Sequence, residues 1–551
     1  MSVDVRVVIQ ARTSSSRLPG KALLPVGGLP SAVLAARRAA RDGAEVVVAT
    51  SEDASDDALA ATLRGAGVRV VRGPLDDVQA RFVLAARGLD DSAAVVRLTA
   101  DNTFPDGAFV RALVDAFRAR GEPYLGTNSP LDDLPYGLSA EVFTAGALRE
   151  AVASAPDAMD REHVTPSLRR RWGGTPFRPA NAPAGLGRLR CTIDTFDDYQ
   201  RVLRVFADVE NPVIVPWLEL CARLEALPDA PRARVPFRLV EGGIHSELVL
   251  GTAQLGMDYG RTNTAGQPEA ADCVRIVRSA IEHGVTHLDT ARAYGDSESR
   301  LGAALEGGWG ARVHTVTKLA PLAELPRDAD EARVGEAVDA SVFRSCRELR
   351  MTSIPTLLLH RAERRTSHGG AVWARLRALR DKGVIGRLGV SVQTTDEAIE
   401  ALADPEVKHV QLPFNLLDHR WRRAGIDRLL LDRPDVVVHA RSVLLQGLLA
   451  ADSADTWPRV AGYEPAAIVS AVRALAEELG REGPLDLCFA YVRAQPWIHG
   501  ALVGVATHAE LMENVALFGR PPLRPEACAR VESAFGDLPE ALLNPALWPR
   551  D

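Results

Sequence analysis

The sequence of 551 residues contains very little lysine. Four of its 65 basic residues are lysine and the others are arginine; the four are Lys21, Lys318, Lys382 and Lys408. A coding bias toward arginine is the simplest explanation. The two side chains are nevertheless not equivalent, because lysine is a compact point charge whereas arginine is a planar fork. The positions that keep lysine are therefore candidates for chemistry that needs a small cation.

Patterns that define several other classes of protein are also missing. The six cysteines are scattered without a CxxC pair, which argues against a disulfide framework and against structural zinc. No run of 18 apolar residues occurs, and the first residues, MSVDVRVVIQ, lack the charged and apolar regions of a signal peptide. No basic run dominates a chain whose net charge is −7. We expect a cytoplasmic globular protein that binds neither nucleic acid nor membrane.

Four short β-branched runs alternate with helical stretches near the start of the sequence, at 3–9, 45–50, 68–71 and 93–99. These runs are apolar on both faces, which is typical of strands in a sheet with helices on both sides. We therefore predict an α/β nucleotide-binding domain at 1–225, with a parallel or mixed Rossmann-like sheet. The next stretch is rich in Pro, Arg and Gly and has no sustained period, so we place a linker at 226–244.

A second series of alternating strands and helices begins after the linker. Eight strand candidates follow one another: ELVLGT, VTHLDT, VHTVTK, IPTLLLH, GRLGVS, KHVQLP, DVVVHA and IHGALVG. Eight strands separated by helices are what a (β/α)8 barrel requires. Periodicity alone does not separate a barrel from an open sheet, but the number of strands favours the barrel. We predict a TIM barrel at 245–540 and a C-terminal tail at 541–551.

A loop rich in Ser, Gly and Pro follows the first predicted strand, with the sequence RTSSSRLPGK at 12–21. The carboxyl ends of parallel strands face the ligand crevice of such a sheet. The loop offers backbone N–H groups and three cations, Arg12, Arg17 and Lys21. Together these groups can hold a triphosphate and neutralise its leaving pyrophosphate. The alternative interpretation is a solvated basic loop.

Five motifs in this half resemble those of the SpsF-like cytidylyltransferases, which are relatives of the CMP-sialic-acid and CMP-Kdo synthetases. In order they are QARTSSSRLPGK (10–21), GPLDDVQARF (73–82), RLTADNTFPD (97–106), REHVTP (161–166) and CTIDTFDDY (191–199). The resemblance implies attack by a sugar hydroxyl on the α-phosphorus of CTP, with Mg²⁺ as cofactor and pyrophosphate as product. It also implies an acidic sugar of the ulosonic or nonulosonic type as the second substrate.

The same resemblance assigns roles to individual residues. Lys21 and Arg12 would be catalytic through their charges on the phosphates. Asp101 and Asp194 stand at the metal-binding positions of the related synthetases, and Mg²⁺ prefers one or two carboxylates together with phosphate oxygens and water. Glu141 and His163 are polar candidates for sugar contact, with surface or packing roles as the alternative. The implied nucleotide-binding residues are Gln10, Ala11, Arg12, Arg17, Gly20, Lys21, Asp77, Arg97 and Asp101.

The stretch HLDTARAYGDSESRLG at 287–302 closely resembles the aldo-keto reductases. The active-site tetrad of that family is Asp, Tyr, Lys and His, placed on loops at the carboxyl ends of successive barrel strands. Taken singly, each of these residue types is more often structural, but four in register indicate a reductase site. The matching residues are Asp289, Tyr294, Lys318 and His360.

Each tetrad residue has a physical reason. Reduction of a carbonyl needs a proton donor near the developing alkoxide, and a lysine cation beside Tyr294 would stabilise the phenolate that remains. Asp289 would pair with Lys318 and hold it in place. His360 would orient the carbonyl oxygen or share the proton. Arginine would not replace Lys318 easily, because its fork is larger and presents no single point charge.

Three further segments resemble the dinucleotide-binding parts of the reductase family: QLPFNLLD, ARSVLLQGLL and VGVATHAELMENV. Many NADPH-dependent members carry Lys or Arg in the last segment, whereas here Ala506 and Thr507 precede His508, the one basic residue of the segment. We expect NADPH or NADH, with NADPH favoured on family grounds. The implied cofactor-binding residues are Ser391, Gln411, Arg441, Ser442, Gly447, Gly504, Glu513 and Asn514.

The two resemblances together predict a bifunctional enzyme. One half would make a CMP-sugar, and the other would reduce a carbonyl-containing sugar or precursor in the same glycan or secondary-metabolite pathway; a homodimer is one expectation for the assembly. Two alternatives stay open. Either one half is catalytic and the other is a binding or scaffolding module, or the first half is a glycosyltransferase-like binder of a nucleotide sugar. The loop at 12–21 favours a triphosphate, because a nucleotide-diphosphate sugar needs fewer cations.

Overall fold

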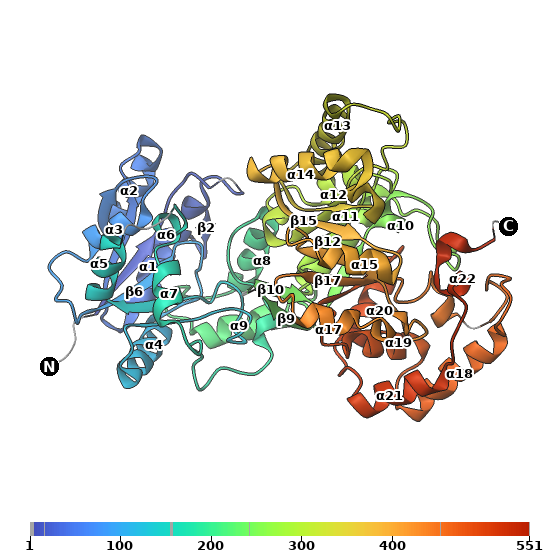
Figure 1. Cartoon of the computed structure of the whole chain (residues 1–551). Coiled ribbons are helices and arrows are strands. Elements are labelled where there is room, and N and C mark those ends of the chain that lie inside the picture. The colour runs from blue at the N-terminus through green and yellow to red at the C-terminus, as the bar shows by residue number, and fades with distance from the viewer. Residues whose placement is uncertain (1–4, 16, 155–157, 242, 452, 550–551) are drawn as a thin grey trace. The chain divides into compact units, whose positions relative to one another are not determined.

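The computed structural model describes residues 5–15, 17–154, 158–241, 243–451 and 453–549. The chain divides into two compact units, Met1–Arg232 and Ala233–Asp551 (Figure 1). Each unit has its own sheet and its own hydrophobic core.

The first unit is built on a six-stranded sheet with the strand order β5-β4-β1-β6-β8-β7. Four strands are parallel, and β8 and β7 extend the sheet by antiparallel pairing. The predicted mixed sheet is therefore confirmed. In sequence order the strands are β1 (Val5–Gln10), β4 (Glu45–Ser51), β5 (Arg69–Gly73), β6 (Ala94–Thr99), β7 (Tyr124–Gly126) and β8 (Glu141–Thr144).

Helices cover both faces of this sheet because its central strands are apolar on both sides. Val7 and Ile9 of β1 belong to one core, whereas Val8, between them, belongs to the other. The first core is completed by α1 (Ser31–Ala39), α2 (Asp57–Gly65), α4 (Gly107–Arg120), α8 (Phe196–Phe206) and α9 (Trp217–Ala226). The second is completed by α3 (Val78–Ala85), α5 (Ala145–Ala153) and α7 (Pro166–Trp172), and α6 (Ala158–His163) packs on α3.

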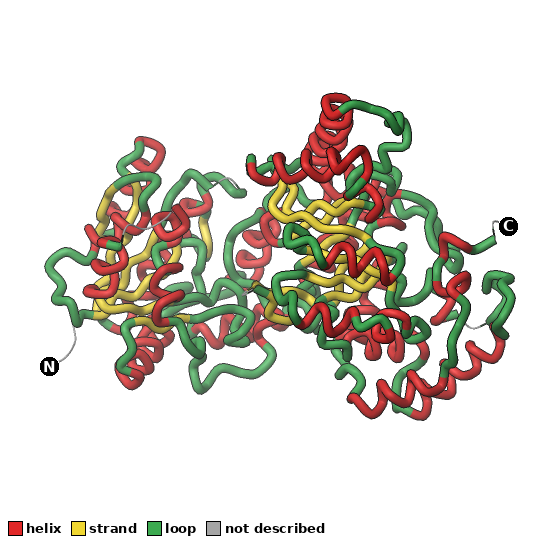
Figure 2. Tube along the Cα trace, in the orientation of Figure 1, coloured by secondary structure: helices red, strands yellow, loops and turns green. Residues whose placement is uncertain are grey.

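The second unit is a closed barrel of eight parallel strands, so the predicted TIM barrel is confirmed. Figure 2 shows its strands in yellow inside a layer of red helices. Each strand coincides with one of the eight runs singled out in the sequence. They are β11 (Leu248–Gly251), β12 (His287–Asp289), β13 (His314–Lys318), β14 (Ile354–Leu359), β15 (Ile385–Ser391), β16 (His409–Pro413), β17 (Val437–Arg441) and β18 (Gly500–Gly504).

The helices around the barrel bury their apolar faces in one continuous core. Most of them connect successive strands, as the (β/α)8 pattern requires. They are α10 (Ala253–Gly256), α11 (Ala270–Glu282), α12 (Ser297–Ala304), α13 (Glu331–Leu349), α14 (Ala371–Asp381), α15 (Thr395–Leu402), α16 (Arg420–Arg423), α17 (Ile426–Leu431), α18 (Pro465–Glu478), α19 (Pro484–Arg493), α20 (His508–Phe518), α21 (Pro525–Ala534) and α22 (Glu540–Leu543).

The segment that we expected to be a linker contains a β-hairpin in its second half. The hairpin consists of β9 (Phe237–Val240) and β10 (Gly243–Ser246). His245 of β10 is buried and stacks on His287, with 3.8 Å between the ring centroids. Its Nε2 lies 2.8 Å from Nε2 of His439. Since His287 begins β12, the hairpin packs at the amino ends of the strands, opposite the end where a barrel places its chemistry.

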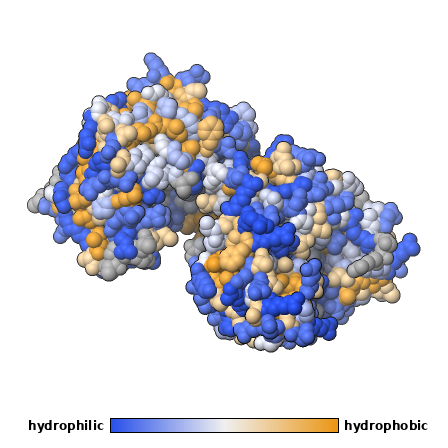
Figure 3. All heavy atoms as spheres, turned by 90° about the horizontal axis from the view of Figure 1, so that it is seen from above, coloured by the Kyte–Doolittle hydropathy of each residue, from blue (hydrophilic) through white to orange (hydrophobic). Residues whose placement is uncertain are grey.

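The surface and the cysteines agree with a folded globular chain. On the face shown in Figure 3, hydrophilic residues surround separate apolar patches. No helix among the described residues is long and apolar enough to cross a membrane. All six cysteines are free and buried.

Candidate active sites

A cavity of about 540 Å³ lies at the carboxyl ends of β1 and β6 in the first unit. The loop after β1 forms one wall, and the segment after β6 forms another. Among the residues predicted to bind nucleotide or metal, Gln10, Ala11, Arg12, Arg17, Lys21, Arg97, Asp101 and Asp194 line this cavity. The structure therefore brings together side chains that are up to 184 positions apart in the sequence.

Lys21 is the centre of this site. Its Nζ lies 2.5 Å from Oδ2 of Asp101 and 2.8 Å from Oδ1 of Asp194. Burial lowers the pKa of Lys21, but the charges and hydrogen bonds of the two carboxylates outweigh it, so the pKa is raised above its ordinary value. The lysine is therefore held as a cation between two carboxylates.

Two arginines also contact Asp194. The guanidinium of Arg17 lies 2.9 Å from Oδ1 of Asp194, and that of Arg190 lies 2.9 Å from Oδ2. Burial raises the pKa of Asp194, but Lys21, Arg190 and Arg17 lower it more strongly, and it stays below its ordinary value. Arg190 also pairs with Asp198, which is the N3 residue of the capping box that starts α8. Sequence reasoning missed Arg190, which directly precedes the CTIDTFDDY motif.

Two expected nucleotide-binding residues do not line the cavity. Asp77 instead caps α3, where its carboxylate accepts a hydrogen bond from the backbone N–H of Ala80 at 2.7 Å. Gly20 lies in the turn before Lys21 with φ of +71°, a left-handed conformation that favours glycine. Gly20 therefore shapes the loop that presents Lys21.

The candidates for sugar contact differ in their surroundings. Glu141 is buried, and its carboxylate accepts hydrogen bonds from Arg97, Arg169, Tyr124 and Thr165. Burial raises the pKa of Glu141, but the two arginines outweigh that effect and hold it at about 2. Glu141 thus orients two arginines that line the cavity. His163 also lines the cavity and is exposed.

The carboxylates fit a magnesium ion. Oδ2 of Asp101 and Oδ1 of Asp194 converge on a single position, which the ammonium group of Lys21 fills. Mg²⁺ typically takes one or two carboxylates and completes its shell with phosphate oxygens and water, so this pair is sufficient. The described residues contain no group of three or more His, Cys, Asp or Glu side chains arranged to hold a metal. A metal here would therefore depend on the nucleotide for its remaining ligands.

A larger cavity, of about 670 Å³, opens at the carboxyl ends of the barrel strands. Asp289 is the last residue of β12 and Lys318 the last residue of β13, while His360 directly follows β14. Tyr294 lies in the loop between β12 and α12. Asp289, Tyr294 and His360 line the cavity, and Lys318 is buried directly behind them with 1% of its surface exposed.

The tetrad side chains contact one another. Nζ of Lys318 lies 2.6 Å from Oδ1 of Asp289 and 4.9 Å from the centroid of the Tyr294 ring. The rings of Tyr294 and His360 meet edge to face, with 5.8 Å between centroids. Burial lowers the pKa of Lys318, but Asp289 and Tyr294 raise it more, so the ammonium ion is retained. Burial, aided by Lys318, Arg361 and Arg441, lowers the pKa of His360 to about 3, which keeps its ring neutral.

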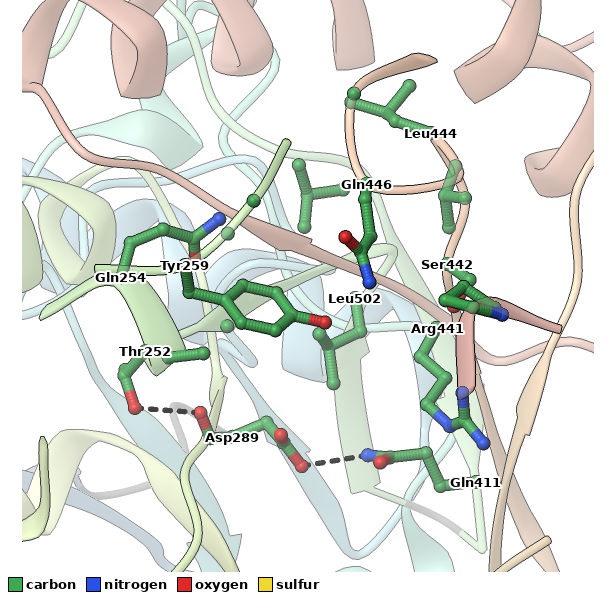
Figure 4. A pocket seen from close by; sticks show the side chains of 18 of the residues that line it. Thr252, Gln254, Tyr259, Asp289, Gln411, Arg441, Ser442, Leu444, Gln446 and Leu502 are labelled. Carbon is green, nitrogen blue, oxygen red and sulfur yellow. Dashed lines mark hydrogen bonds between the residues drawn. The ribbon is translucent and has the colours of Figure 1, made fainter. Parts of the chain in front are cut away.

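All eight expected cofactor residues line the same cavity: Ser391, Gln411, Arg441, Ser442, Gly447, Gly504, Glu513 and Asn514. Figure 4 shows Gln411 reaching across to Asp289, whose Oδ2 accepts a hydrogen bond from the Gln411 amide at 2.8 Å. Gly447 has φ of +93°, and a Cβ there would lie 1.8 Å from Oγ1 of Thr262. The chain therefore requires glycine at position 447, where it bends at the wall of the cavity.

The cavity fits a dinucleotide. Its volume lies within the usual range for ligand pockets, about 300–1,000 Å³. Two buried lining atoms, Nδ1 of His360 and Nε2 of Gln393, have no hydrogen-bond partner among the described residues. Unpartnered buried polar atoms are costly unless a ligand or water satisfies them.

The last of the three dinucleotide-binding segments, VGVATHAELMENV, lines the cavity with acidic rather than basic side chains. Glu510 and Glu513 line it, whereas Nε2 of His508 lies 3.0 Å from Oγ of Ser279. The carboxylate of Glu510 accepts the backbone N–H groups of Ala506 and Thr507, which completes a capping box at the start of α20.

Sequence reasoning missed several polar residues that line this cavity, among them Tyr259, Gln254, Arg361 and Gln393. In Figure 4 the Tyr259 ring points into the cavity between Gln254 and Arg441. Tyr259 lies in a long loop after β11, and none of the motifs includes it. Arg361 directly follows His360, so the strand-end argument that found the histidine could also have drawn attention to it.

Two family models match the chain, one over each unit. The model of the aldo/keto reductase family matches residues 247–535, and that of the cytidylyltransferase family matches residues 6–226. The chain belongs to both families. Residues of the cytidylyltransferase domain are 32% identical over 240 residues to the spore coat polysaccharide biosynthesis protein SpsF of Bacillus subtilis; the match spans 42% of this chain and 98% of that protein.

A second relative and a solved structure are also similar to parts of the chain. The cytidylyltransferase domain is 30% identical over 193 residues to the 3-deoxy-manno-octulosonate cytidylyltransferase of Acidovorax sp. (strain JS42), over 33% of this chain and 71% of that protein. For the aldo/keto reductase domain, the solved structure of the aldo-keto reductase AKR11C1 from Bacillus halodurans matches with 22% identity and a TM-score of 0.45, over 55% of this chain and 97% of that one.

Proposed function

We propose that the chain is a bifunctional enzyme of sugar activation. Its cytidylyltransferase domain transfers a cytidylyl group from CTP to an acidic sugar of the ulosonic or nonulosonic type, giving a CMP-sugar and pyrophosphate. Its aldo/keto reductase domain uses NADPH or NADH to reduce a carbonyl group on a sugar or precursor of the same pathway. The observation that carries the proposal is a lysine paired with carboxylates in each unit. Lys21 contacts Asp101 and Asp194, and Lys318 contacts Asp289.

In the first domain, catalysis would come mainly from positioning and charge. Arg12, Arg17 and Lys21 surround the space where a triphosphate would lie, and Arg12 sits at its exposed edge beside Glu162. Mg²⁺, when bound by Asp101 and Asp194, would neutralise phosphate charge. Related sequences support the choice of sugar, because an octulosonate is an acidic sugar.

In the second domain, the bound nicotinamide cofactor would supply a hydride to the carbonyl carbon. Tyr294 would give its proton to the carbonyl oxygen, and the buried Lys318 would stabilise the phenolate that remains. Asp289 fixes the lysine through the 2.6 Å contact. The neutral His360 ring would donate to, or orient, the same oxygen.

The transfer activity is tested by incubating the pure protein with CTP, Mg²⁺ and a panel of ulosonic acids while following pyrophosphate release. Lys21→Ala should lower the rate by about 100- to 1,000-fold, because it removes a cation from the phosphates. Binding of NADPH, followed by fluorescence, should remain. No pyrophosphate from any sugar or nucleotide would disprove transfer and favour a nucleotide-sugar binder.

The reductase activity is tested with Tyr294→Phe. The variant loses only the hydroxyl that would donate the proton, so carbonyl reduction should fall by about 100-fold or more. Quenching of cofactor fluorescence should persist, since the ring remains in place. Unchanged turnover would contradict the role of the tetrad.

A further inference from the structure

We infer that the reductase pocket recognises its carbonyl substrate through a carboxylate, which Arg361 and Arg441 bind beside the tetrad. The inference rests on the proposed reductase function and adds a substrate class to it.

Two guanidinium groups at the tetrad end of the pocket, those of Arg441 and Arg361, have no anionic partner among the described residues. Arg441 ends β17, and its Nη2 donates to the backbone oxygen of Val392 at 3.0 Å and to Oε1 of Gln393. Both acceptors are neutral. Arg361 is exposed at the pocket wall, and among the described residues no carboxylate forms an ion pair with either arginine.

The pocket carboxylates nearest to these arginines are already engaged. Asp289 holds Lys318 with one oxygen and accepts from Gln411 with the other. Glu397 accepts the backbone N–H groups of Gln393 and Thr394 in the capping box of α15. Its charge therefore offsets the amino end of that helix. The tetrad end keeps an excess of positive charge.

The same corner of the pocket also has more donors than acceptors. Arg441 occupies the oxygen of the Gln393 side chain, which leaves the buried Nε2 of that side chain without an acceptor. Figure 4 shows the guanidinium of Arg441 beside Gln411, within the polar group that surrounds Asp289. An oxyanion placed here would meet the planar guanidinium of Arg441, which can bind a carboxylate in a bidentate manner, and Arg361 lines the same pocket.

A carboxylate so placed lies close to the reacting centre. Arg361 directly follows His360 in the chain, and both arginines line the same cavity as Asp289, Tyr294 and His360. Their positive charges also help burial to lower the pKa of His360. A sugar acid whose carbonyl group lies a few bonds from its carboxylate could place the carboxylate on the arginines and the carbonyl at the tetrad. The pyrophosphate of the dinucleotide is the other anion that could use Arg441, and the experiment has to separate the two.

The test compares ligands that differ only in charge: para-formylbenzoate with para-formylbenzamide, and D-glucuronate with D-glucuronamide. Their affinities are measured by calorimetry on the full chain saturated with NADP⁺, so that no turnover is needed. The wild type should bind the carboxylate about 10- to 100-fold more tightly in at least one pair, the range expected for charge-assisted hydrogen bonds. Equal affinity within both pairs, or no binding of any of the four, would overturn the inference.

Arg361→Gln should remove most of that preference and leave the affinity for the amides unchanged. Arg364→Gln is the matched control, because Arg364 lies in the short helix Ala362–Arg365 that directly follows Arg361 but does not line the pocket. Arg441→Lys keeps the charge without the fork, so it should lower the preference for the carboxylate in the enzyme saturated with NADP⁺. If this variant lost affinity for NADPH but kept the preference for the carboxylate, Arg441 would bind the pyrophosphate of the cofactor. Its proposed role in recognising the substrate would then be wrong. Absent turnover with an intact preference would contradict the reductase function alone.

Discussion

Lys318 is enclosed more completely than any other lysine. Its ammonium group contacts Asp289, donates to the backbone oxygen of Thr290 at 3.0 Å and faces the Tyr294 ring. With 1% of its surface exposed, the side chain has no room for a larger head group. In the other domain, Lys21 is likewise held between two carboxylates. Both positions require a small cation, which a guanidinium is not.

Lys318→Arg should therefore disable the reductase although it conserves charge. The larger fork would overfill a packed site, at a cost of about 1–3 kcal/mol in stability. It would also displace the cation from Tyr294, so kcat/KM for carbonyl reduction should fall by about 100-fold. Steady-state kinetics and urea unfolding measure the two effects.

Lys382→Arg is the control for this substitution, because Lys382 is exposed and follows α14 on the outside of the barrel. It should leave both activity and stability unchanged. A Lys318→Arg enzyme with wild-type turnover would show that charge alone suffices at this position.

At the level of elements, the hairpin β9–β10 is joined to the barrel through imidazole rings. Nδ1 of His245 lies 2.9 Å from the backbone oxygen of Ser246, an atom that only accepts, so Nδ1 carries the proton. Nε2 of a neutral His245 must then accept from Nε2 of His439. This leaves Nδ1 of His439 without a proton and without a partner among the described residues. Protonation of both rings would break the contact, because both Nε2 atoms would then be donors.

Acid should weaken this contact. Burial and neighbouring positive charge lower the pKa of His245 to about 3 and those of His314 and His499 to about 4. The unfolded chain, with ordinary histidines near pH 6.5, binds more protons than the folded one, so the free energy of unfolding falls as the pH drops below about 6.5. The loss is about 1.4 kcal/mol per pH unit for each histidine, down to its folded pKa.

Urea unfolding between pH 7 and pH 5, followed by tryptophan fluorescence, measures this slope. His245→Gln should reduce the slope by up to one proton per molecule. His163→Gln, at an exposed position of the first unit, should leave it unchanged. Equal slopes in the wild type and His245→Gln would show that the hairpin histidine does not carry the effect.

Most elements were predictable because each of them carries its own pattern. The eight barrel strands are continuous apolar runs, and the tetrad stands at or after their ends. The hairpin was not predictable, because its short strands lie in a Pro- and Arg-rich stretch and gain their partners from residues such as His439, far along the chain. Arg190 and Gln393 were missed for the same reason: their roles come from contacts between segments that only the fold brings together.

At the level of the whole molecule, each unit closes its own core. The two units meet in sequence at Arg232 and Ala233, and each active site is lined by residues of one unit only. Independent cores predict independent folding.

The separately produced segments Met1–Arg232 and Ala233–Asp551 should each unfold cooperatively in calorimetry. Pyrophosphate release by the first and carbonyl reduction by the second should stay within about twofold of the full chain, because the residues that carry each activity remain together. An insoluble segment, or an activity that needs both segments mixed, would show that the units depend on each other.

The shortage of lysine also determines how the molecule can be labelled. Two of the four ε-amino groups are shielded at the active sites, whereas Lys382 and Lys408 are accessible, the latter with 42% of its side chain exposed. Both accessible lysines belong to the barrel. Acylation of lysine side chains at low dose would thus place a dye or tether on the barrel's exterior and spare the buried ammonium groups of Lys21 and Lys318, while the cytidylyltransferase unit would offer no lysine outside its own site.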